Sequence, residues 1–456
     1  MQKKIVILGA GPTGLGAAWR LKELKYENYK VFDRLPFPGG LAASFVDEKG
    51  FTWDIGGHVQ FSHYEYFDKL MDLLLKDMWL FHERESWVWI KNRFVPYPFQ
   101  NNIRYLPKED MWKCLSGIIE LYKNKSQIPP KNFREWVLEN FGSGLAEVFM
   151  LPYNFKVWAY PPEKLSYSWI GERVALLDLK RVTENVIFEK DDLSWGPNNT
   201  FRFPLKGGTG EVWRQLYSRL DKEKIILNSE AVSVNTKKKE IVFKGHKESY
   251  DILISTMPLD LLILNSDIKD KTPAKKLVHS STNIFGLGLK GKPSPGLNNK
   301  CWMYFPEDNC PFYRVTVFSN YSPNNVPDIK KYWSLMLEVS ESPDKPVNHN
   351  TIKEEVIQGA LNTKLIKSRS DIVDYWEHSE SHGYPTPSVE RDEGLKVLKE
   401  LEKLSIFSRG RFGAWKYETS NQDHSLMQGV EIVNRLLLGQ EEMTIWHPEI
   451  VNAKKK

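Results

Sequence analysis

The sequence predicts an α/β protein in which a discontinuous Rossmann-like domain carries a helical insertion domain and an antiparallel β-sheet domain. Three observations predict this class. A strand, a glycine turn and a helix open the chain, apolar residues at helical spacing fill residues 66–181, and short β-rich segments follow residue 201. A chain of 456 residues is too long for one simple core, so we expect two or three domains, or one large domain with insertions.

The composition is that of an ordinary globular protein, with 41% apolar and 27% charged residues. The net charge is only +5 and the basic residues are spread along the chain, so we expect no nucleic-acid partner. No window reaches the roughly 20 apolar residues that a membrane span needs, so we expect no membrane partner. Cys114, Cys301 and Cys310 form no CxxC pair, which argues against a disulfide scaffold or a zinc module and is typical of a reducing, cytoplasmic setting.

The opening segment KKIVILGAGPTGLGAAWRLKEL predicts a dinucleotide site. The apolar run IVIL is typical of a strand buried on both faces, and Gly9, Gly11 and Gly14 form a GxGxxG motif. Such a turn lets the backbone approach a pyrophosphate at the positive end of the following helix. The next strand, YKVFD, ends in Asp33, nineteen residues after Gly14, where a carboxylate can accept ribose hydroxyls. A GxGxxG motif alone is weak evidence for nucleotide binding, but a strand, a helix, a second strand and an acidic residue in this order predict it.

The segment that follows Asp33 favours FAD over NAD. An acid, five residues and then the pair Gly39–Gly40 is the continuation seen in flavoproteins of the amine-oxidase type. There the second glycine turn lets the chain pass close to the FAD, and NAD enzymes do not need it. The arginine that usually follows the pair is Leu41 in this sequence.

The stretch DIGGHVQFSH places a third glycine pair, Gly56–Gly57, directly before His58, with His63 five residues further on. No HExxH pattern or Cys/His cluster supports a metal ion, so we expect none. We expect the glycines to bring the backbone against the flavin and His58 to lie at the isoalloxazine near N5. Its predicted work is to hydrogen-bond the flavin and respond to reduction, not to act as the main base. His63 is predicted to line the same mobile loop, and simple packing is the alternative.

Two later segments return to the nucleotide site. YDILISTMP predicts an apolar strand that ends in small residues. NQDHSLMQGVEIVNRLLLG predicts a turn followed by a helix, whose N-terminus could serve as a second cradle for the pyrophosphate. The FAD-binding domain is therefore predicted to use both chain ends. The expected boundaries are 1–75, 205–260 and 405–456 for the FAD-binding domain, 76–190 for the helical substrate domain, and 191–204 with 261–404 for the antiparallel sheet domain.

Arginine, tyrosine and tryptophan are dense in PYNFKVWAYPPEKLSYSWIGERVA, CWMYFPEDNCPFYRVTVFSNYSP and FSRGRFGAWKYETSNQDHS. Arginine grips phosphate with two parallel hydrogen bonds, tyrosine hydroxyls add donors, and rings stack on a heterocycle. The combination fits an anionic ligand with a flat base, such as a nucleotide sugar. The alternative is a wet surface on which arginines cover aromatic rings, and composition leaves both open.

The chain resembles the eukaryotic-type UDP-galactopyranose mutases over nearly its whole length. The matching strings run in order from the first strand to near the C-terminus and are long and specific. They are GAGPTGLGAA, GGHVQFSHYEYFD, VPYPFQNNI, PYNFKVWA, TFRFP with GGTG, CWMYFPEDNCPFYR, YWSLMLEVSES, HGYPTP and SRGRFGAWKYETSNQDHS.

The resemblance implies an isomerase, of the intramolecular-transferase type, that interconverts UDP-galactopyranose and UDP-galactofuranose. It implies that FAD is active when reduced: flavin N5 attacks the anomeric carbon, UDP leaves, the flavin–sugar adduct opens and recloses, and UDP returns without net redox. NADPH is the implied electron donor, and because no second GxGxxG marks a separate nicotinamide domain, it would use the same cleft as the sugar nucleotide. The choice between NADPH and NADH and the oligomeric state stay open, with a homo-oligomer as one outcome.

The resemblance also implies roles for individual residues. Arg173 and Arg314 match arginines that grip the pyrophosphate, and with His58 they form the expected catalytic set. Arg84 matches an arginine near the isoalloxazine that also faces NADPH. The implied substrate-binding residues are the uridine pocket Tyr97, Phe99, Gln100, Phe149, Asn154 and Trp158, the phosphate ligands Arg173, Arg314, Tyr304, Tyr384 and Tyr417, and Asn198 and Asn421. The expected cofactor-binding residues are Gly9, Gly11, Pro12, Thr13, Gly14, Asp33, Arg34, Gly39, Gly40, Leu41, Gly56, Gly57, His58, Val232, Thr256, Arg411, Asn421, Gln422, Asp423 and Ser425.

Two other functions share some of these features. An FAD-dependent, amine-oxidase-like oxidoreductase would have the same N-terminal motifs, and a catalytically inactive nucleotide-sugar binder would have the same aromatic segments. The pair Arg173 and Arg314 distinguishes the first alternative, because a neutral amine site does not need two arginines. The intact flavin motifs argue against the second.

Overall fold

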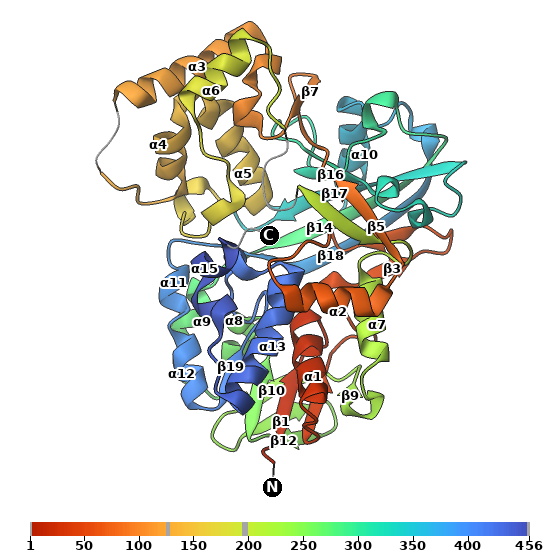
Figure 1. Cartoon of the computed structure of the whole chain (residues 1–456), viewed down its shortest axis with the longest axis vertical. Helices are drawn as coiled ribbons and strands as arrows, with labels where there is room; N and C mark the ends of the chain where they lie inside the picture. Colours follow the sequence, from red (N-terminus) through yellow and green to blue (C-terminus); the bar gives the residue numbers. More distant parts are fainter. Residues whose placement is uncertain (1, 125–127, 194–198, 454–456) are drawn as a thin grey trace.

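The computed structural model describes residues 2–124, 128–193 and 199–453. Within these ranges a five-stranded parallel sheet forms the lower part of the molecule in Figure 1, with the strand order β19-β13-β1-β2-β9. It joins segments from both ends and the middle of the chain, so the predicted discontinuous Rossmann-like domain is confirmed. The strands are β1 (Ile5–Leu8), β2 (Tyr29–Phe32), β9 (Ile225–Ile226), β13 (Ile252–Ser255) and β19 (Ile406–Ser408).

Strand β1 is buried on both faces, as its apolar run predicts. Ile5 and Ile7 belong to one hydrophobic core, and Val6 and Leu8 belong to another on the opposite face of the sheet. The first core includes α1 (Pro12–Glu23), α2 (Glu65–Leu75), α7 (Gly210–Ser218) and α13 (Gln422–Leu438). The second includes α8 (Leu259–Leu264), α9 (Thr272–Lys276), α12 (Val397–Lys403) and α14 (Met443–Trp446).

Helices α1 and α13 pack with their backbones almost touching. A Cβ atom built on Gly429 would lie 2.0 Å from the carbonyl oxygen of Thr13, so any larger residue there would push the helices apart. Further along, Arg20 Nε donates to Asn434 Oδ1 at 2.7 Å. This close contact sets the N-termini of both helices at the carboxyl edge of the sheet, where two positive helix ends can face one anion.

The helical insertion occupies the upper left of Figure 1. It consists of α3 (Lys108–Lys123), α4 (Phe133–Leu145), α5 (Leu151–Trp158) and α6 (Leu179–Ile187) around a core of its own. The predicted segment 76–190 is wrong at its start, because it opens with three strands. They are β5 (Trp79–Glu83), β6 (Ser86–Ile90) and β7 (Arg93–Pro96).

Strands β6 and β7 form a hairpin that the helical periodicity of the surrounding sequence conceals. The two-residue turn uses Lys91 (φ 52°) and Asn92 (φ 59°), both left-handed, which is the backbone geometry that closes a tight hairpin. Lysine is uncommon at such a position, so the turn carries no glycine signal and only the alternation of SWVWI points to a strand.

The predicted antiparallel sheet is present at the upper right of Figure 1. Its order in the described ranges is β18-β14-β17-β16-β15-β6-β7, and every neighbouring pair is antiparallel except β15 with β6. Helix α10 (Ile352–Asn362) packs on the core of this sheet. The strands not yet given are β14 (His279–Lys290), β15 (Trp302–Tyr304), β16 (Arg314–Val317), β17 (Tyr332–Glu341) and β18 (Ile372–Pro385).

The expected boundary at residue 405 is also corrected, because α12 belongs with the parallel sheet. Val397, Leu398 and Leu401 pack in the same core as Ile406 of β19. The remaining small elements are β3 (Ser44–Val46), β4 (Thr52–Asp54), β8 (Thr200–Pro204), β10 (Ala231–Asn235), β11 (Glu240–Phe243), β12 (Lys247–Ser249), α11 (Arg391–Gly394) and α15 (Pro448–Asn452).

Every helix in the described ranges is too short or too polar to cross a lipid bilayer. Cys114, Cys301 and Cys310 are buried and unpaired. Burial also raises the pKa of all three thiols, to about 12, 11 and 11, respectively. We therefore expect them to be inert packing residues.

Candidate active site

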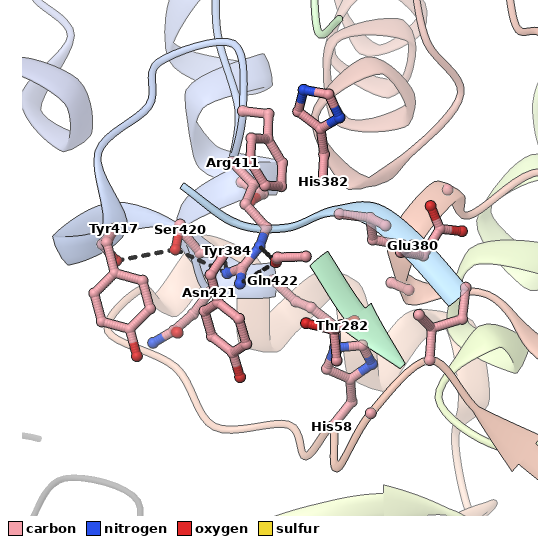
Figure 2. A pocket seen from close by; sticks show the side chains of 18 of the residues that line it. His58, Thr282, Glu380, His382, Tyr384, Arg411, Tyr417, Ser420, Asn421 and Gln422 are labelled. Carbon is pink, nitrogen blue, oxygen red and sulfur yellow. Dashed lines mark hydrogen bonds between the residues drawn. The ribbon is translucent and has the colours of Figure 1, made fainter. Parts of the chain in front are cut away.

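A cavity of about 680 Å³ opens at the carboxyl ends of the parallel strands, where all three parts of the structure meet. This volume lies within the range of sites that hold a small molecule or cofactor, roughly 300 to 1,000 Å³. Its walls include the glycine turn after β1, the loop Gly56–His58, the insertion helix α5 and the strand β18. Figure 2 shows Arg411, Tyr384, Tyr417 and Asn421 along one wall, with His58 and Thr282 below them.

At one end of the cavity, Asp33 braces the glycine turn. Its two carboxylate oxygens accept the backbone N–H groups of Ala10 at 2.5 Å and Leu35 at 2.8 Å. Burial raises the pKa of the carboxyl, and the two backbone hydrogen bonds oppose this rise. Each oxygen keeps a lone pair. Asp33 can therefore hold the turn in shape and still accept the ribose hydroxyls of a dinucleotide.

A buried carboxylate, Glu338 of β17, connects the loop Gly56–His58 to Arg314 of β16. One oxygen accepts the Gly57 N–H at 3.1 Å and Arg314 Nε at 2.7 Å, and the other accepts Arg314 Nη2 at 2.7 Å and the Tyr313 hydroxyl at 2.8 Å. Burial opposes the negative charge of Glu338, but the positive charge of Arg314 and these four hydrogen bonds hold the pKa of Glu338 below its usual range. Glu338 is only 1% exposed, so its charge depends on Arg314.

The imidazole of His58 projects into the same region. Its Nδ1 atom is buried and has no hydrogen-bond partner among the described residues. Burial, with Arg411 and Arg314 nearby, lowers the pKa of His58 to about 4, although Glu338 opposes the shift. The ring is therefore neutral near pH 7 and a weak base. An unpartnered buried nitrogen beside a glycine cradle fits contact with a bound flavin, and so the residues present fit FAD.

Away from Asp33, the cavity wall is rich in arginine and tyrosine. Arg173 lies at the end of a 3-10 turn, Gly171–Arg173, with its guanidinium 5.4 Å from the centre of the Tyr417 ring. Arg314 Nη2 lies 3.4 Å from the Tyr384 hydroxyl. Two cations and two phenols on one cavity wall are the donors that a diphosphate requires.

A stack of aromatic rings continues this wall toward the insertion. The rings of Phe149 and Tyr153 stack at 5.2 Å, and Tyr153 meets Tyr304 edge-on at 5.3 Å. Tyr97 packs against Tyr304 at 5.3 Å, and the Arg84 guanidinium lies 5.7 Å from the centre of the Tyr97 ring. This surface is suited to a flat base. The cavity thus joins a dinucleotide cradle, an anion grip and an aromatic slot.

Comparison with known proteins agrees with this combination. The family description "Flavin containing amine oxidoreductase" matches residues 12–295, more than half of the chain. A crystal structure of reduced UDP-galactopyranose mutase matches with a TM-score of 0.97 and 49% sequence identity, covering 100% of this chain and 98% of that chain. The chain belongs to the UDP-galactopyranose mutases.

Two solved structures of much lower sequence identity share the fold only. A fatty acid isomerase from P. acnes matches at 14% identity and a TM-score of 0.66, and a putrescine oxidase bound to putrescine matches at 14% identity and 0.65. Each match covers 96% of this chain and 99% of the other. A scaffold used for such different substrates says little about chemistry, so the substrate argument for this mutase chain rests on the cavity.

Most of the residues predicted for the mutase site line this one cavity. The cofactor group on the wall comprises Gly9, Gly11, Pro12, Thr13, Asp33, Arg34, Gly40, Leu41, Gly56, Gly57, His58, Arg84, Thr256, Arg411, Asn421, Gln422 and Ser425. The substrate group on the wall comprises Tyr97, Gln100, Phe149, Asn154, Trp158, Arg173, Tyr304, Arg314, Tyr384 and Tyr417. Their roles remain predictions. Asn198 lies outside the described residues.

Two predicted cofactor glycines lie behind the cavity wall. A Cβ on Gly14 would lie 1.8 Å from the carbonyl oxygen of Gly9, so this glycine is needed for the strand–helix contact. Gly39 has a left-handed φ of 110°. Its N–H donates to the carbonyl oxygen of Ala10 at 2.9 Å, and this hydrogen bond joins the second glycine turn to the first. Both shape the cradle without facing it.

Three other predicted residues also do not line the cavity. Val232 is 47% exposed on β10, at a register shift between Ala231 and Ser233, and Ala231 lines the cavity instead. Phe99 is fully buried and stacks on Phe149 with a ring separation of 4.4 Å, so it backs the aromatic slot. Asp423 is fully buried under His63.

Glu338 and Tyr153 are two of the cavity-wall residues that were not predicted from the sequence. Glu338 had a weak signal, a carboxylate inside the apolar run YWSLMLEVSE. Tyr153 had a clearer one, because it lies four residues after Phe149 and one before Asn154, both of which were predicted. Helical spacing alone places it on the face of Phe149.

His63 lines the cavity and also packs, and its place in a mobile loop remains a prediction. Its backbone N–H donates to Asp423 Oδ2 at 3.0 Å, and its Nδ1 lies 2.8 Å from the same oxygen. The His63 and His424 rings stack at 4.7 Å, and His424 Nε2 lies 3.0 Å from Asn452 Oδ1. This network ties the loop after His58 to the start of α13.

We expect His424 to make folding stability depend on pH. Burial lowers the pKa of His424 to about 4, against about 6.5 when unfolded. Between these values the unfolded chain binds more protons, so His424 makes the unfolding free energy rise with pH by up to about 1.4 kcal/mol per unit. In His424→Gln, urea unfolding from pH 4.5 to 6.5 should show a slope smaller by nearly this amount. His349→Gln, at a side chain 58% exposed, is the control, and equal slopes in both variants would contradict the prediction.

Proposed function

We propose that this protein interconverts UDP-galactopyranose and UDP-galactofuranose without net redox, using reduced FAD bound in the cavity. The observation that carries the proposal is the location of Arg173 and Arg314 on the wall of the cavity that also contains the dinucleotide cradle. An amine oxidase acting on a neutral amine has no need for two arginines beside the flavin. Membership of the mutase family supports the same substrate.

The chain offers two sets of residues that would hold FAD. The glycine turn and the N-terminus of α1, with Asn421, Gln422 and Ser425 at the start of α13, would face the pyrophosphate. Asp33 would accept the ribose hydroxyls. When bound, reduced FAD would supply the nucleophile for the anomeric carbon of the sugar.

The protein's own work in this reaction would be electrostatic. Departure of UDP from the sugar increases negative charge on the diphosphate, and Arg173 and Arg314 would stabilise that charge in place of water. The hydroxyls of Tyr304, Tyr384 and Tyr417 would add neutral donors. The aromatic slot would hold the uracil ring, which keeps UDP bound while the sugar ring opens and recloses.

Reduction of the flavin should switch the activity on. Dithionite-reduced holoenzyme is expected to convert UDP-galactofuranose to UDP-galactopyranose, and oxidised holoenzyme is expected to convert none, as followed by chromatography. The flavin should stay reduced throughout, because there is no net redox. Absence of conversion by the reduced holoenzyme would refute the mutase proposal. Bleaching of oxidised flavin by an amine substrate would favour the oxidoreductase alternative.

NADPH is proposed as the physiological reductant, bound in the same cleft before the sugar nucleotide. The support is the position of Arg84 on the cavity wall, and the second GxGxxG string of the sequence, at 286–291, runs along strand β14 and its end, so it marks no separate nicotinamide domain. UDP should then slow the reduction of flavin by NADPH in stopped-flow measurements, and faster reduction with NADH would reverse the cofactor preference. A reducing cytoplasmic setting and a homo-oligomeric state are further proposals. The free cysteines support the first.

A further inference from the structure

A buried ion pair lies directly behind Arg173. The guanidinium of Arg391, only 2% exposed, donates from Nη1 to Glu418 Oε2 at 2.8 Å and from Nη2 to Glu418 Oε1 at 3.2 Å. Arg391 also donates from Nη2 to Ser168 Oγ at 3.2 Å and from Nε to Asp392 Oδ1 at 2.9 Å. Neither Arg391 nor Glu418 lines the cavity in the described structure, so neither has a role in the mechanism above.

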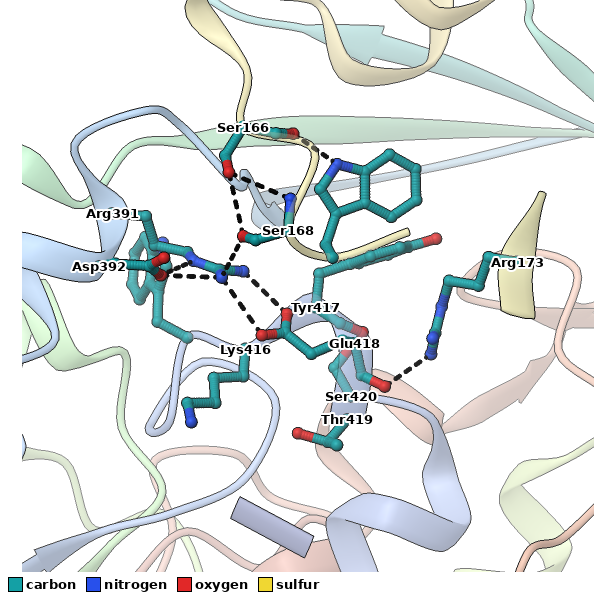
Figure 3. Close-up of polar contacts among 12 residues, drawn as sticks. Ser166, Ser168, Arg173, Arg391, Asp392, Lys416, Tyr417, Glu418, Thr419 and Ser420 are labelled. Atoms are coloured by element: carbon teal, nitrogen blue, oxygen red, sulfur yellow. Dashed lines mark hydrogen bonds and ion pairs between the residues drawn. The ribbon is translucent and has the colours of Figure 1, made fainter. Parts of the chain in front are cut away.

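Glu418 accepts hydrogen bonds from two different arginines, one at its side-chain carboxylate and one at its backbone carbonyl. Its carboxylate is held by Arg391, while its backbone carbonyl accepts Arg173 Nη2 at 2.9 Å and Asn452 Nδ2 at 3.1 Å. Figure 3 shows Arg391 and Arg173 approaching this one residue from opposite sides. The position of the carbonyl that receives Arg173 therefore depends on the ion pair.

The same turn also presents Tyr417 to the cavity. Glu418 is the middle residue of the 3-10 turn Tyr417–Thr419, and the Tyr417 ring lies edge-on to Trp158 at 4.8 Å and to Trp169 at 5.3 Å. Trp169 follows Ser168, the hydroxyl that Arg391 contacts. The ion pair thus joins the turn that carries Tyr417 to the segment that leads into Arg173.

A buried ion pair is weak evidence for stability, because removing two charges from water offsets most of their attraction. Its geometry here suggests another use. Among the described residues, the Arg173 guanidinium makes one hydrogen bond, to the Glu418 carbonyl, so its direction depends on that contact. We propose that Arg391 and Glu418 are positioning residues that aim Arg173 and Tyr417 at the diphosphate of the substrate. The inference rests on the proposed function for the identity of that substrate.

The test compares UDP with uridine, which lacks the diphosphate. In FAD-loaded Arg391→Ala and Glu418→Ala, the Kd for UDP should rise at least tenfold by calorimetry, while uridine binding, followed by NMR saturation transfer, should change less than twofold. The double variant should bind UDP no more weakly than either single variant, because the two side chains act as one unit. A general loss of structure would weaken the binding of both UDP and uridine, and that outcome would count against a positioning role.

Conservative variants keep the test decisive if the alanine variants fail to fold. Glu418→Gln removes the charge but keeps the shape, and Arg391→Lys keeps the charge but removes the two-pronged contact. Both should raise the Kd for UDP and the KM of the sugar nucleotide more than they lower kcat. An unchanged Kd for UDP in folded, FAD-loaded Glu418→Gln would overturn the proposal.

A matched control is available in a second buried ion pair. Glu442 is 1% exposed and accepts Arg409 Nη2 at 2.8 Å, and neither residue lines the cavity. Glu442→Gln should lower the melting temperature without changing the Kd for UDP, and equal effects of Glu442→Gln and Glu418→Gln on UDP would count against positioning. If wild-type enzyme binds UDP but does not convert the sugar, the proposed function fails while the comparison of UDP with uridine still tests the ion pair.

Discussion

Arg314→Ala should lower kcat/KM by roughly 150-fold or more while FAD remains bound. The basis is the loss of one charged contact to the diphosphate as it departs, which costs about 3 kcal/mol or more. The same change removes the partner of the buried Glu338 carboxylate and leaves its charge uncompensated. The variant should therefore also lose about 3 to 5 kcal/mol of unfolding free energy. Steady-state kinetics with reduced enzyme and denaturant unfolding measure the two effects separately.

A second substitution distinguishes the two effects. In Arg314→Ala with Glu338→Gln, the buried charge is gone, so most of the lost stability should return, while kcat/KM should stay low because the diphosphate still lacks its arginine. Recovery of both stability and turnover in the double variant would show that Arg314 acts only as a structural counter-ion. Loss of flavin from either variant would show that Arg314 belongs to the cofactor site.

Gly11→Ala should abolish FAD binding without unfolding the protein. The nearest non-neighbouring atoms to a Cβ on Gly11 are a carbonyl oxygen of Gly39 at 3.8 Å and Cα of Gly40 at 3.9 Å, so the protein itself has room for a methyl group. The space lies on the cavity wall, where the backbone must approach the pyrophosphate. Flavin content after refolding with FAD, from the absorbance ratio, should fall to near zero, with a native-like apo-protein melting profile.

The control for this prediction is Gly14→Ala, which changes the same motif for a different reason. Its Cβ would lie 1.8 Å from the Gly9 carbonyl oxygen, an overlap within the protein. Gly14→Ala should therefore destabilise the apo-protein as well as prevent flavin binding. Normal flavin content in Gly11→Ala would contradict a close pyrophosphate contact at that position.

The elements predicted well are those whose signals are local. The strand at Ile5–Leu8, the helix from Pro12 and the acid Asp33 depend on the order of residues within one short unit, and the structure has all three. The hairpin β6–β7 escaped prediction because its turn, Lys91–Asn92, lacks glycine and stands among helical patterns. Val232 was predicted to bind the cofactor, but Ala231 lines the cavity instead, at a register shift of β10 that no residue pattern indicates.

The contacts of the arginines could not be predicted in the same way. Arg314 and Glu338 are cross-strand partners in the register of β16 with β17, and register is set by the packed sheet. Arg173 meets the carbonyl of Glu418, 245 positions away in the sequence. No periodicity or motif in either segment carries information about such a partner.

A dinucleotide cradle, and arginines and aromatic rings suited to an anionic ligand with a flat base, are predictable from the sequence alone. These follow from residue type and short spacing, which act through backbone geometry and side-chain chemistry within each segment. The contact of Glu338 with Arg314, and the position of Arg391 and Glu418 behind Arg173, become apparent in the folded chain alone. Those pairings arise when distant segments pack and buried charges must find partners, and that requirement exists only in the folded chain.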